Sequence, residues 1–473
     1  MFKYSKTKLV CTIGPASNNK ETIKKMILNG MNVARLNFSH GNHDSHRATI
    51  ALVREAAKEL GVYVGILQDL CGPKIRLGIL PEDGIHLIDG QEVFLAASDE
   101  NCPHCIPVDY SGIHNELEAG ERILIADGLM ELVVLEINGK KIRCKVINGG
   151  MAFSRKGVNM PQSKLKVAAF SDKDRSDLLM GLNEQVDFVA MSFVRNAKDL
   201  DEIKKIISTS SYRPKLIAKI EKPQAVENID EIINAADGVM VARGDLGVEM
   251  PLEQIPHIQK KIIKSARQAG RVVITATQML ASMVSAPRPT RGETTDVANA
   301  VLDGTDALML SDETANGKYP ELAVETLSKI ARAAEPYAVS SLSLDSSVFF
   351  NETSLTKAIG RAACWLAKDI NAAAIVCFTA SGYAAYSISA FRPECKIIAL
   401  TRDKNICRQT SIVWGATAVI STPVEDTDAH IAEAVKQVKE IGAVNKGDKI
   451  VVTAGLPFGQ AHTTSFIKVV EVD

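Results

Sequence analysis

The chain has 473 residues, which is too long for one hydrophobic core, so two or three domains are expected. Its 55 basic and 56 acidic residues leave a formal net charge of −1, which excludes a global positive field for binding nucleic acid or anionic lipid. No apolar run is long enough to span a membrane, and the N-terminal run ends at Gly14-Pro15, so we expect a cytoplasmic protein without a secretory leader.

The first 70 residues alternate short apolar runs with amphipathic segments. Strands are predicted at 8–14, 32–38 and 62–69, and helices at 18–29 and 44–60. Such a succession of strand and helix units predicts a parallel sheet with right-handed crossover connections.

The pattern changes at Cys71-Gly72-Pro73. From about residue 74 to 167 the segments are short and alternating, glycines separate them, and no helical period appears. We therefore predict a small β-barrel domain inserted at residues 71–167.

The nine cysteines are odd in number and stand mostly in apolar runs, which is typical of reduced thiols in a cytoplasmic protein. Cys102-Pro103-His104-Cys105 has the spacing of half a zinc or redox site, but no second Cys-x-x-Cys follows. We expect two ordinary loop cysteines there, with a zinc site as the alternative.

The strand and helix pattern resumes after Phe170. Ser171 is a predicted N-cap, followed by acidic residues in the first turn, where the helix dipole favours them. Further strands are predicted at 187–193, 215–221, 238–244, 271–278 and 307–311. Three strands before the insertion and five after it predict a (β/α)8 TIM barrel formed by residues 1–70 and 168–340. A doubly wound sheet is the alternative, although it gives no reason to stop at eight strands.

Residues 341–473 form a third predicted unit, which begins with a linker at about 340–351. Its alternating pattern predicts helices at 355–369 and 426–441 and strands at 373–379, 396–400, 417–420 and 449–453. The final strand, 465–470, follows a loop without a helix, so we expect an antiparallel edge strand in an α/β C-terminal domain.

Charged residues follow the fifth and sixth predicted strands of the barrel. Lys219 and Glu221 are two residues apart and therefore on one face of a strand, and Asp245 follows the next strand in the turn Ala242-Arg243-Gly244-Asp245. Barrel enzymes carry their sites at the carboxyl ends of the strands. Two carboxylates and one ammonium there predict a site for a hard divalent cation, Mg²⁺ or Mn²⁺, that carries an anion.

Several motifs occur in an order and spacing that resemble the pyruvate kinase family, of bacterial type. The motifs are 32–41, 219–221, 240–249, 274–280, 289–291, 296–300 and 309–314. The resemblance is clear over the barrel, fair over the insertion and weaker over the last domain. It implies transfer of phosphate from phosphoenolpyruvate to ADP, giving pyruvate and ATP in the last step of glycolysis, by an allosteric homotetramer.

The resemblance also implies roles for individual residues. Glu221 and Asp245 would hold Mg²⁺, Lys219 would stabilise the transferring phosphoryl group, and Arg35 would clamp the phosphate. The backbone N–H groups of Gly244 and Asp245 would hold the substrate carboxylate, and Thr277 would complete that pocket and join a proton relay. The positions that match nucleotide contacts are Asn37, Phe38, Ser39, His40, Arg76 and Lys156.

One departure from the family pattern concerns potassium. Positions matching the family's K⁺ site are Asn37, Ser39, Asp69 and the carbonyl of Leu70, but Lys74 stands where K⁺-dependent members carry Glu. A tethered ammonium can substitute for a monovalent cation, because both supply one positive charge. We predict activity largely independent of K⁺. Asp312 and Gly292 also depart from the pattern.

The C-terminal domain keeps Thr379, Ser381 and Gly382 in a turn before a helix, which is either a phosphate cradle or a plain turn. Ala380 and Tyr383 replace the basic residues of members that bind fructose 1,6-bisphosphate, so a sugar monophosphate or a nucleotide is the expected effector. The alternatives to a pyruvate kinase are a Mg²⁺-dependent barrel lyase acting on pyruvate enolate and a catalytically silent metabolite sensor.

Overall fold

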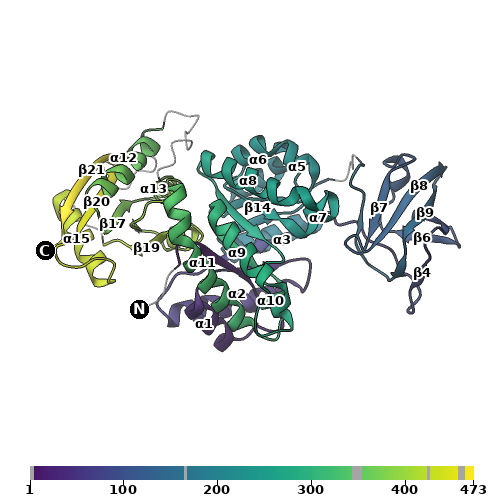
Figure 1. The fold of residues 1–473 in the computed structure, drawn as a ribbon, viewed down its shortest axis with the longest axis horizontal. Helices are drawn as coiled ribbons and strands as arrows, with labels where there is room; N and C mark the ends of the chain where they lie inside the picture. Colours follow the sequence, from purple (N-terminus) through teal and green to yellow (C-terminus); the bar gives the residue numbers. More distant parts are fainter. Residues whose placement is uncertain (1–4, 164–167, 344–353, 423–426, 456–463) are drawn as a thin grey trace.

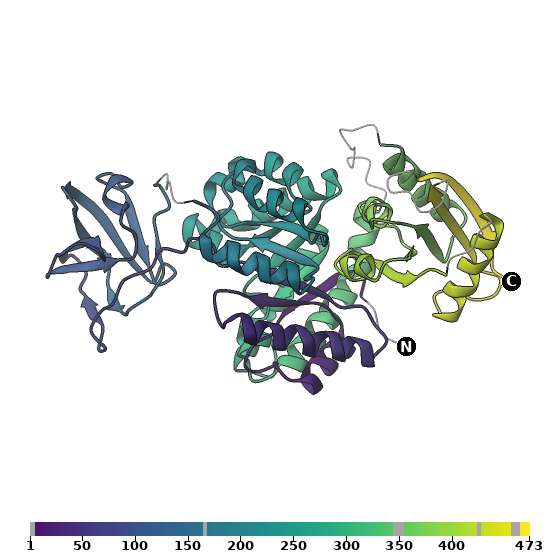
Figure 2. The same cartoon turned by 180° about the vertical axis from the view of Figure 1, so that it is seen from behind.

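The computed structural model describes residues 5–163, 168–343, 354–422, 427–455 and 464–473. Figure 1 shows three bodies in a row, with a helix-wrapped barrel in the middle, a β domain on one side and an α/β domain on the other. In the view from behind in Figure 2 the barrel is again in the middle, so the two outer domains lie on opposite sides of it.

The central body is a closed barrel of eight parallel strands, which confirms the predicted TIM barrel. The doubly wound alternative is wrong, because β1 pairs with both β2 and β16 and so leaves no open edge. In order around the barrel, the strands are β1 (Lys8–Thr12), β16 (Ala307–Leu310), β15 (Val272–Ala276), β14 (Gly238–Ala242), β13 (Lys215–Ile220), β12 (Phe188–Met191), β3 (Gly65–Asp69) and β2 (Met31–Asn37).

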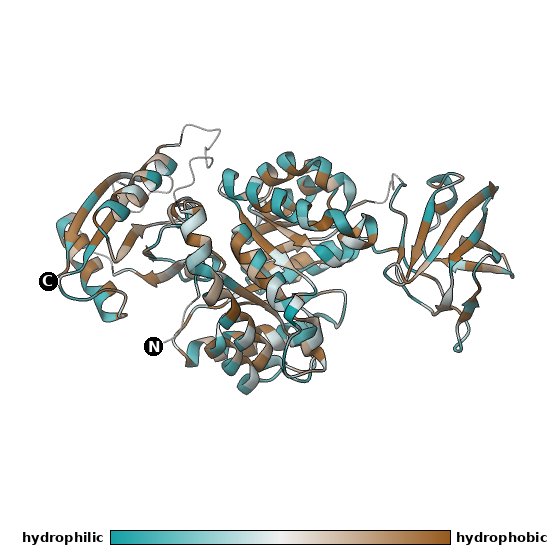
Figure 3. Cartoon of the chain, viewed as in Figure 1, coloured by the Kyte–Doolittle hydropathy of each residue, from teal (hydrophilic) through white to brown (hydrophobic). Residues whose placement is uncertain are grey.

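The barrel strands are buried on both faces, and this explains their continuous apolar runs in the sequence. Every residue of β3, β14 and β15 is buried. In Figure 3 the strands are brown for most of their length, inside helices that carry teal surfaces.

Amphipathic helices surround the barrel, each beginning near the carboxyl end of a strand. They are α1 (Lys20–Asn29), α2 (His43–Glu59), α3 (Asp172–Asn183), α4 (Asp201–Thr209), α5 (Pro223–Glu227), α6 (Ile229–Ala235), α7 (Arg243–Glu249), α8 (Ile255–Ala269), α9 (Arg291–Asp303), α10 (Asp312–Ala315) and α11 (Pro320–Leu342). The predicted N-cap at Ser171 is confirmed, since its side chain accepts a hydrogen bond from the Asp174 amide.

The insertion is a separate β domain with its own hydrophobic core, as predicted. Its strands form a six-stranded sheet and a two-stranded ribbon. Residues 75–78 lie between the two edges of that sheet, since Leu77 forms a β-bridge with Val108 and the Val158 amide donates to the Ile75 carbonyl, in keeping with the predicted β-barrel. The sheet order is β11 (Val158–Asn159), β7 (Arg122–Ile125), β8 (Met130–Asn138), β9 (Lys141–Asn148), β5 (Glu92–Ala97) and β6 (Cys105–Val108), and the ribbon pairs β10 (Gly150–Ala152) with β4 (Ile85–Leu87).

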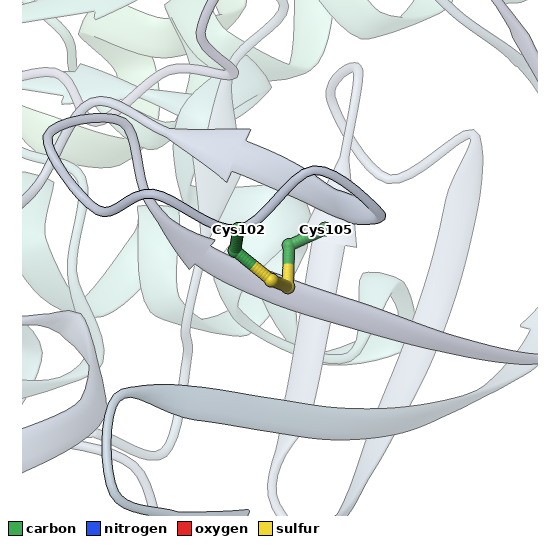
Figure 4. Close-up of a disulfide and its surroundings, with 2 residues drawn as sticks. All are labelled: Cys102 and Cys105. Atoms are coloured by element: carbon green, nitrogen blue, oxygen red, sulfur yellow. A yellow bond between two sulfur atoms is a disulfide. The ribbon is translucent and has the colours of Figure 1, made fainter.

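Cys102 and Cys105 form a disulfide in the loop between β5 and β6 (Figure 4). The expectation of reduced thiols is therefore wrong for this pair, because the turn brings the two Cα atoms to 5.3 Å, within the range that a disulfide spans. In the described part of the chain, no group of three or more His, Cys, Asp or Glu residues could hold a metal ion, so the zinc alternative lacks further ligands.

The C-terminal domain is a five-stranded sheet covered by helices. Its order is β19 (Ala416–Ile420), β18 (Lys396–Thr401), β17 (Ala374–Phe378), β20 (Lys449–Gly455) and β21 (Thr464–Glu471), with helices α12 (Leu355–Asp369), α13 (Tyr383–Ser389), α14 (Lys404–Thr410) and α15 (Thr427–Glu440). β21 is antiparallel to β20 at the edge, which confirms that prediction. The predicted linker begins inside α11, and from residue 344 to its end it lies outside the described residues.

The C-terminal domain closes the amino end of the barrel. Side chains from the barrel interior, such as Phe188 and Met240, belong to one hydrophobic cluster with Phe391 and Val413 of that domain. The carboxyl end of the barrel is therefore left to face the insertion. Among the described residues, no helix combines the length and the apolar character that crossing a membrane requires.

Candidate active site

A buried lysine lies at the centre of the carboxyl end of the barrel. Lys219 Nζ, near the end of β13, lies 2.8 Å from Glu221 Oε1 and 3.2 Å from Asp69 Oδ1. It also donates a hydrogen bond of 2.8 Å to Ser192 Oγ, which in turn donates to the carbonyl of Leu70. The structure thus brings together side chains from three neighbouring strands, β3, β12 and β13.

Opposing effects fix the charge of this cluster. Burial lowers the pKa of Lys219, but the carboxylates of Asp69, Glu221 and Asp245 outweigh it and raise that pKa above its ordinary value. Burial would raise the pKa of Asp69, yet Lys219 and Arg35 bring it below its ordinary value. Lys219 is therefore a permanent cation beside an ionised Asp69.

Glu221 and Asp69 each carry a buried carboxylate oxygen that lacks a well-aligned donor among the described residues. Oε2 of Glu221 accepts a hydrogen bond of 2.7 Å from the Phe193 amide, but its buried Oε1 has no well-aligned donor among the described residues, although Lys219 Nζ is close. Burial raises the pKa of Glu221 above its ordinary value even though Lys219 lowers it, and the nearby Asp245 carboxylate raises it further. A cation between these two carboxylates would remove that cost.

Asp245 lies in the first turn of α7, which follows β14 directly. β14 is the neighbour of β13 in the barrel, with Ile220 opposite Val241. The Asp245 side chain is 34% exposed, whereas that of Glu221 is fully buried. The pair therefore presents one fixed carboxylate and one that faces the open end of the barrel.

Thr277 approaches the same turn from β15. Its Oγ1 accepts a hydrogen bond of 2.7 Å from the Gly244 amide and donates to the Ala276 carbonyl. Thr277 and Gln278 have φ angles of 69° and 54°, and a left-handed β-branched residue costs about 1–3 kcal/mol unless its surroundings hold it. A Cβ on residue 244 would lie 3.4 Å from Thr277 Oγ1, an ordinary van der Waals contact, so the turn packs closely against Thr277 without a steric need for glycine.

Arg243 holds this strained segment. Its guanidinium donates to the carbonyls of Thr277 at 2.7 Å and Ala276 at 3.3 Å, and it pairs with Asp296 of α9 at 2.8 Å. The sequence reasoning gave no role to Arg243 or to Ser192. Their positions at the ends of predicted strands indicate that Arg243 and Ser192 lie near the site. Their hydrogen-bond partners depend on tertiary contacts that the sequence does not show.

Arg35 projects from β2 and is 8% exposed. Its Nε and Nη2 both lie 2.7 Å from Asp69 Oδ2, and its Nη1 donates to Thr12 Oγ1 at 2.8 Å. Asp69 therefore binds two cations, Arg35 and Lys219, and fixes the plane of the guanidinium at the edge of the cluster.

The positions predicted for potassium are partly engaged with other groups. Asn37 Oδ1 accepts from the Ser39 amide at 3.1 Å, and the Leu70 carbonyl accepts from Ser192. The ion pairs of Lys74 among the described residues are with Asp127 of the insertion at 3.6 Å and with Asp245 at 4.0 Å.

The predicted nucleotide residues fall into two groups. The segment Asn37–His40 follows β2, where the Phe38 ring is buried and stacks on His46 with ring centroids 3.9 Å apart. Arg76 and Lys156 lie on the two segments that join the insertion to the barrel. These segments pair with each other, since Arg76 forms a β-bridge with Gly157 and Arg76 Nη1 donates to the Arg155 carbonyl.

The predicted effector turn lies in the C-terminal domain, away from the cluster. Thr379 lines a cavity of about 280 Å³ together with Arg402 and His430, and Gly382 has φ +81° at the start of α13. Asp312 begins α10 and accepts from Asn316, and nothing in the structure explains Gly292.

The family comparisons agree with this geometry. The model described as "Pyruvate kinase, barrel domain" matches residues 4–324, and the one described as "Pyruvate kinase, alpha/beta domain" matches residues 357–470. Pyruvate kinases of Staphylococcus epidermidis and Staphylococcus aureus are each 44% identical over 467 residues, which cover 98% of this chain and 80% of theirs.

A solved structure extends the likeness to the whole fold. The crystal structure of a pyruvate kinase from Cryptosporidium parvum superposes with a TM-score of 0.92 at 39% identity, covering 99% of this chain and 96% of that one. The chain belongs to the pyruvate kinase family.

Proposed function

We propose that this protein catalyses transfer of the phosphoryl group of phosphoenolpyruvate to ADP, giving pyruvate and ATP. The observation that carries this assignment is the buried Lys219, held among Asp69, Glu221 and Ser192 at the carboxyl end of the barrel. A fixed cation beside carboxylates that can bind a metal is what phosphoryl transfer requires, because the reaction moves a highly charged group without covalent help from the protein.

Glu221 and Asp245 are the residues proposed to hold Mg²⁺ or Mn²⁺. The poorly satisfied Oε1 of Glu221, the carboxylate oxygens and the exposure of Asp245 fit such an ion. Mg²⁺ sites often use one or two carboxylates and complete their shell with substrate phosphate and water. When bound, the ion supplies positive charge to the phosphate and to the enol oxygen.

Arg35 and Lys219 are proposed to bind the phosphoryl group. Asp69 holds both cations in place before substrate arrives, so little reorganisation is needed as charge develops on the transferring group. The planar guanidinium of Arg35 can contact two phosphate oxygens, and the ammonium of Lys219 acts as a point charge.

The turn at Gly244 and Asp245 is proposed to bind the substrate carboxylate through its backbone N–H groups. The Gly244 amide now donates to Thr277 Oγ1, so the threonine hydroxyl marks a position that a carboxylate oxygen can take. Released from that bond, the Thr277 hydroxyl would be able to pass a proton towards the enolate carbon, with the Arg243 contacts keeping its backbone fixed.

ADP is proposed to bind between the end of β2 and the insertion, using Asn37, Ser39, His40, Arg76 and Lys156. Phe38 would support this site from beneath, because its ring is buried against His46. Since the two connecting segments pair with each other, the insertion at residues 71–167 can close as one lid and exclude water.

Lys74 is proposed to make the activity largely independent of K⁺. Its ammonium lies 4.0 Å from Asp245 Oδ1 and can add the single positive charge that K⁺ supplies in other members. Rates in Na⁺, K⁺ and tetramethylammonium buffers should therefore agree, and Lys74→Glu should become stimulated by K⁺. A strong K⁺ stimulation of the unmodified enzyme would overturn this idea.

The C-terminal domain, residues 341–473, is proposed to serve assembly and regulation in a cytoplasmic homotetramer. The cavity beside Thr379 carries the basic Arg402, which suits a sugar monophosphate or a nucleotide. Light scattering would measure the oligomeric state, and calorimetric titration with glucose 6-phosphate, ribose 5-phosphate and AMP would test the effector class.

A coupled assay that follows ADP-dependent pyruvate formation tests the principal assignment. The unmodified enzyme should form pyruvate and ATP in equal amounts, and Lys219→Met should abolish both. A lyase would form pyruvate without ADP, and a silent sensor would bind phosphoenolpyruvate without turnover, so either result would contradict the proposal.

A further inference from the structure

The disulfide in the insertion differs from the rest of the cysteines in its surroundings. Of the nine cysteines, seven are free thiols, and five of these are buried. Burial raises the pKa of Cys144, Cys377 and Cys407 to about 12, so these thiols are poor nucleophiles at neutral pH. Cys102 and Cys105 are partly exposed instead, and Pro103 and His104 between them are exposed.

The Cys102–Cys105 bond closes a loop too short to explain its presence by stability. The two cysteines are three residues apart, and the Cys105 amide already donates to the Cys102 carbonyl in a turn. A cross-link over so few residues removes little conformational freedom from the unfolded chain. Thiol–disulfide exchange explains the bond better than stabilisation does, because an accessible Cys-x-x-Cys pair can exchange with external thiols.

The disulfide is attached to the strand that supports the proposed nucleotide site. Cys105 is the first residue of β6, which pairs with β5 along one side. Just beyond its other end, the Asp109 amide donates to the Arg76 carbonyl at 2.8 Å, and Val108 forms a β-bridge with Leu77. The four residues of β6 thus connect the disulfide to the backbone of Arg76.

We propose that Cys102 and Cys105 form a reversible dithiol–disulfide site, and that the disulfide holds β6 in place and thereby positions Arg76 for ADP. A dithiol reductant supplies the electrons. Its thiolate attacks one sulfur of the pair, the Cys–Cys bond breaks, and its second thiol displaces the resulting mixed disulfide. The reductant leaves as a cyclic disulfide, and both cysteines become thiols. The effect on ADP rests on the function proposed above for Arg76, whereas the exchange itself does not.

The exchange is tested on the full-length protein without an activity assay. After incubation in buffers with graded ratios of reduced to oxidised glutathione, free thiols are alkylated and the peptide carrying Cys102 and Cys105 is quantified by mass spectrometry. A single reversible transition of this pair is expected, while the buried Cys144 and Cys377 stay unchanged until the protein is denatured. A pair that stays reduced under oxidising buffers, or stays oxidised in dithiothreitol, would overturn the site.

The coupling to Arg76 is tested by kinetics on the same samples. Reduction should raise the KM for ADP by about two- to tenfold, the range expected for losing the order of one side chain, and leave the KM for phosphoenolpyruvate unchanged. Cys102→Ser/Cys105→Ser should match the reduced enzyme in both redox buffers. Cys395→Ser is the matched control, a partly exposed free thiol in the C-terminal domain, and it should keep the redox response.

The redox exchange of Cys102 and Cys105 and its coupling to Arg76 can be contradicted independently of each other. Exchange with an unchanged KM for ADP would overturn the coupling while the redox site stands. A redox response that persists in Cys102→Ser/Cys105→Ser would assign it to another thiol and overturn the proposal. Loss of ADP-dependent turnover in every sample would instead contradict the function proposed for the whole chain.

Discussion

The two ends of the barrel are both rich in buried charges, but they satisfy these charges differently. At the amino end, Asp187 is fully buried and accepts from Arg54, the Ile66 amide, Tyr212 and Arg408 at 2.7–2.9 Å. At the carboxyl end, Glu221 keeps an oxygen without a well-aligned donor among the described residues, and Asp245 is partly exposed. Similar residue types therefore build a structural joint where every lone pair is used and a proposed binding site where some are left over.

The largest effect is expected from removing the cation at the carboxyl end. Lys219→Met should lower kcat by about a thousandfold or more, because a preorganised donor to the transition state is lost. Steady-state kinetics measure the loss, and circular dichroism should show an unchanged fold. A variant that keeps a tenth of the activity would remove Lys219 from the chemistry.

At the amino end, the expected cost is in stability. Asp187→Asn should lower the free energy of unfolding by about 3–5 kcal/mol, since Arg54 and Arg408 would lose their buried partner. Urea denaturation gives this value, and kcat at 25 °C should change less than it does in Lys219→Met. A large loss of kcat without a loss of stability would mean that the two ends do not differ as described.

Lys8 is a buried cation at the amino end of the barrel, and its hydrogen-bond partner is a carbonyl rather than a carboxylate. Its Nζ donates to the Ala416 carbonyl at 2.7 Å, and burial lowers its pKa from 10.5 to about 8, against the opposite pull of Glu335. Lys8→Met should therefore raise the free energy of unfolding at pH 7 by about 2 kcal/mol, after allowing for the lost hydrogen bond.

The pH dependence of Lys8→Met follows from the lowered pKa. Below pH 8 the folded protein holds a buried charge, and between pH 8 and 10.5 the folded state releases its proton before the unfolded state does. The free energy of unfolding of the unmodified protein therefore rises between pH 8 and 10.5. The difference in stability between Lys8→Met and the unmodified protein should decrease over the same range. Denaturation curves from pH 6 to about 10 measure this, and a constant difference would contradict the assigned pKa.

The smallest expected effect comes from the residue that positions Thr277. Arg243→Lys should lower kcat/KM for phosphoenolpyruvate by about tenfold, because Arg243 reaches two carbonyls and Asp296 from three separate nitrogens of its planar guanidinium, whereas lysine has its donors on a single nitrogen. Deuterium exchange into the methyl group of pyruvate, followed by NMR, should slow in parallel. Arg392→Lys is the matched control, a buried arginine paired with Asp306 at the amino end, and it should affect stability alone.

Much of the barrel, and the placing of the carboxylates proposed to bind a metal, could be predicted from sequence. Parallel strands buried on both faces appear as apolar runs, and the polar residues that follow them, such as Glu221 and Asp245, meet at one end of the barrel. The eight barrel strands and the antiparallel β21 could therefore be predicted from the sequence alone.

Other features depend on contacts between distant segments. The left-handed backbone at Thr277 goes against the preference of a β-branched residue, so sequence alone does not predict it, and Arg243 supports it across 34 residues. The pairing of residues 76–77 with Val108 and Gly157 in the insertion and the Cys102–Cys105 bond likewise depend on where turns bring the chain. Secondary-structure propensities and the spacing of residues in a motif describe local segments, and they do not specify which distant segments contact each other.

The shared hydrophobic cluster at the amino end of the barrel has a consequence for synthesis. Phe188 and Met240 leave the ribosome long before Phe391 and Val413, which complete their packing. A nascent chain that ends after the barrel therefore carries an apolar opening that water can reach. During translation this surface is a binding site for chaperones and a source of aggregation until the last domain folds over it.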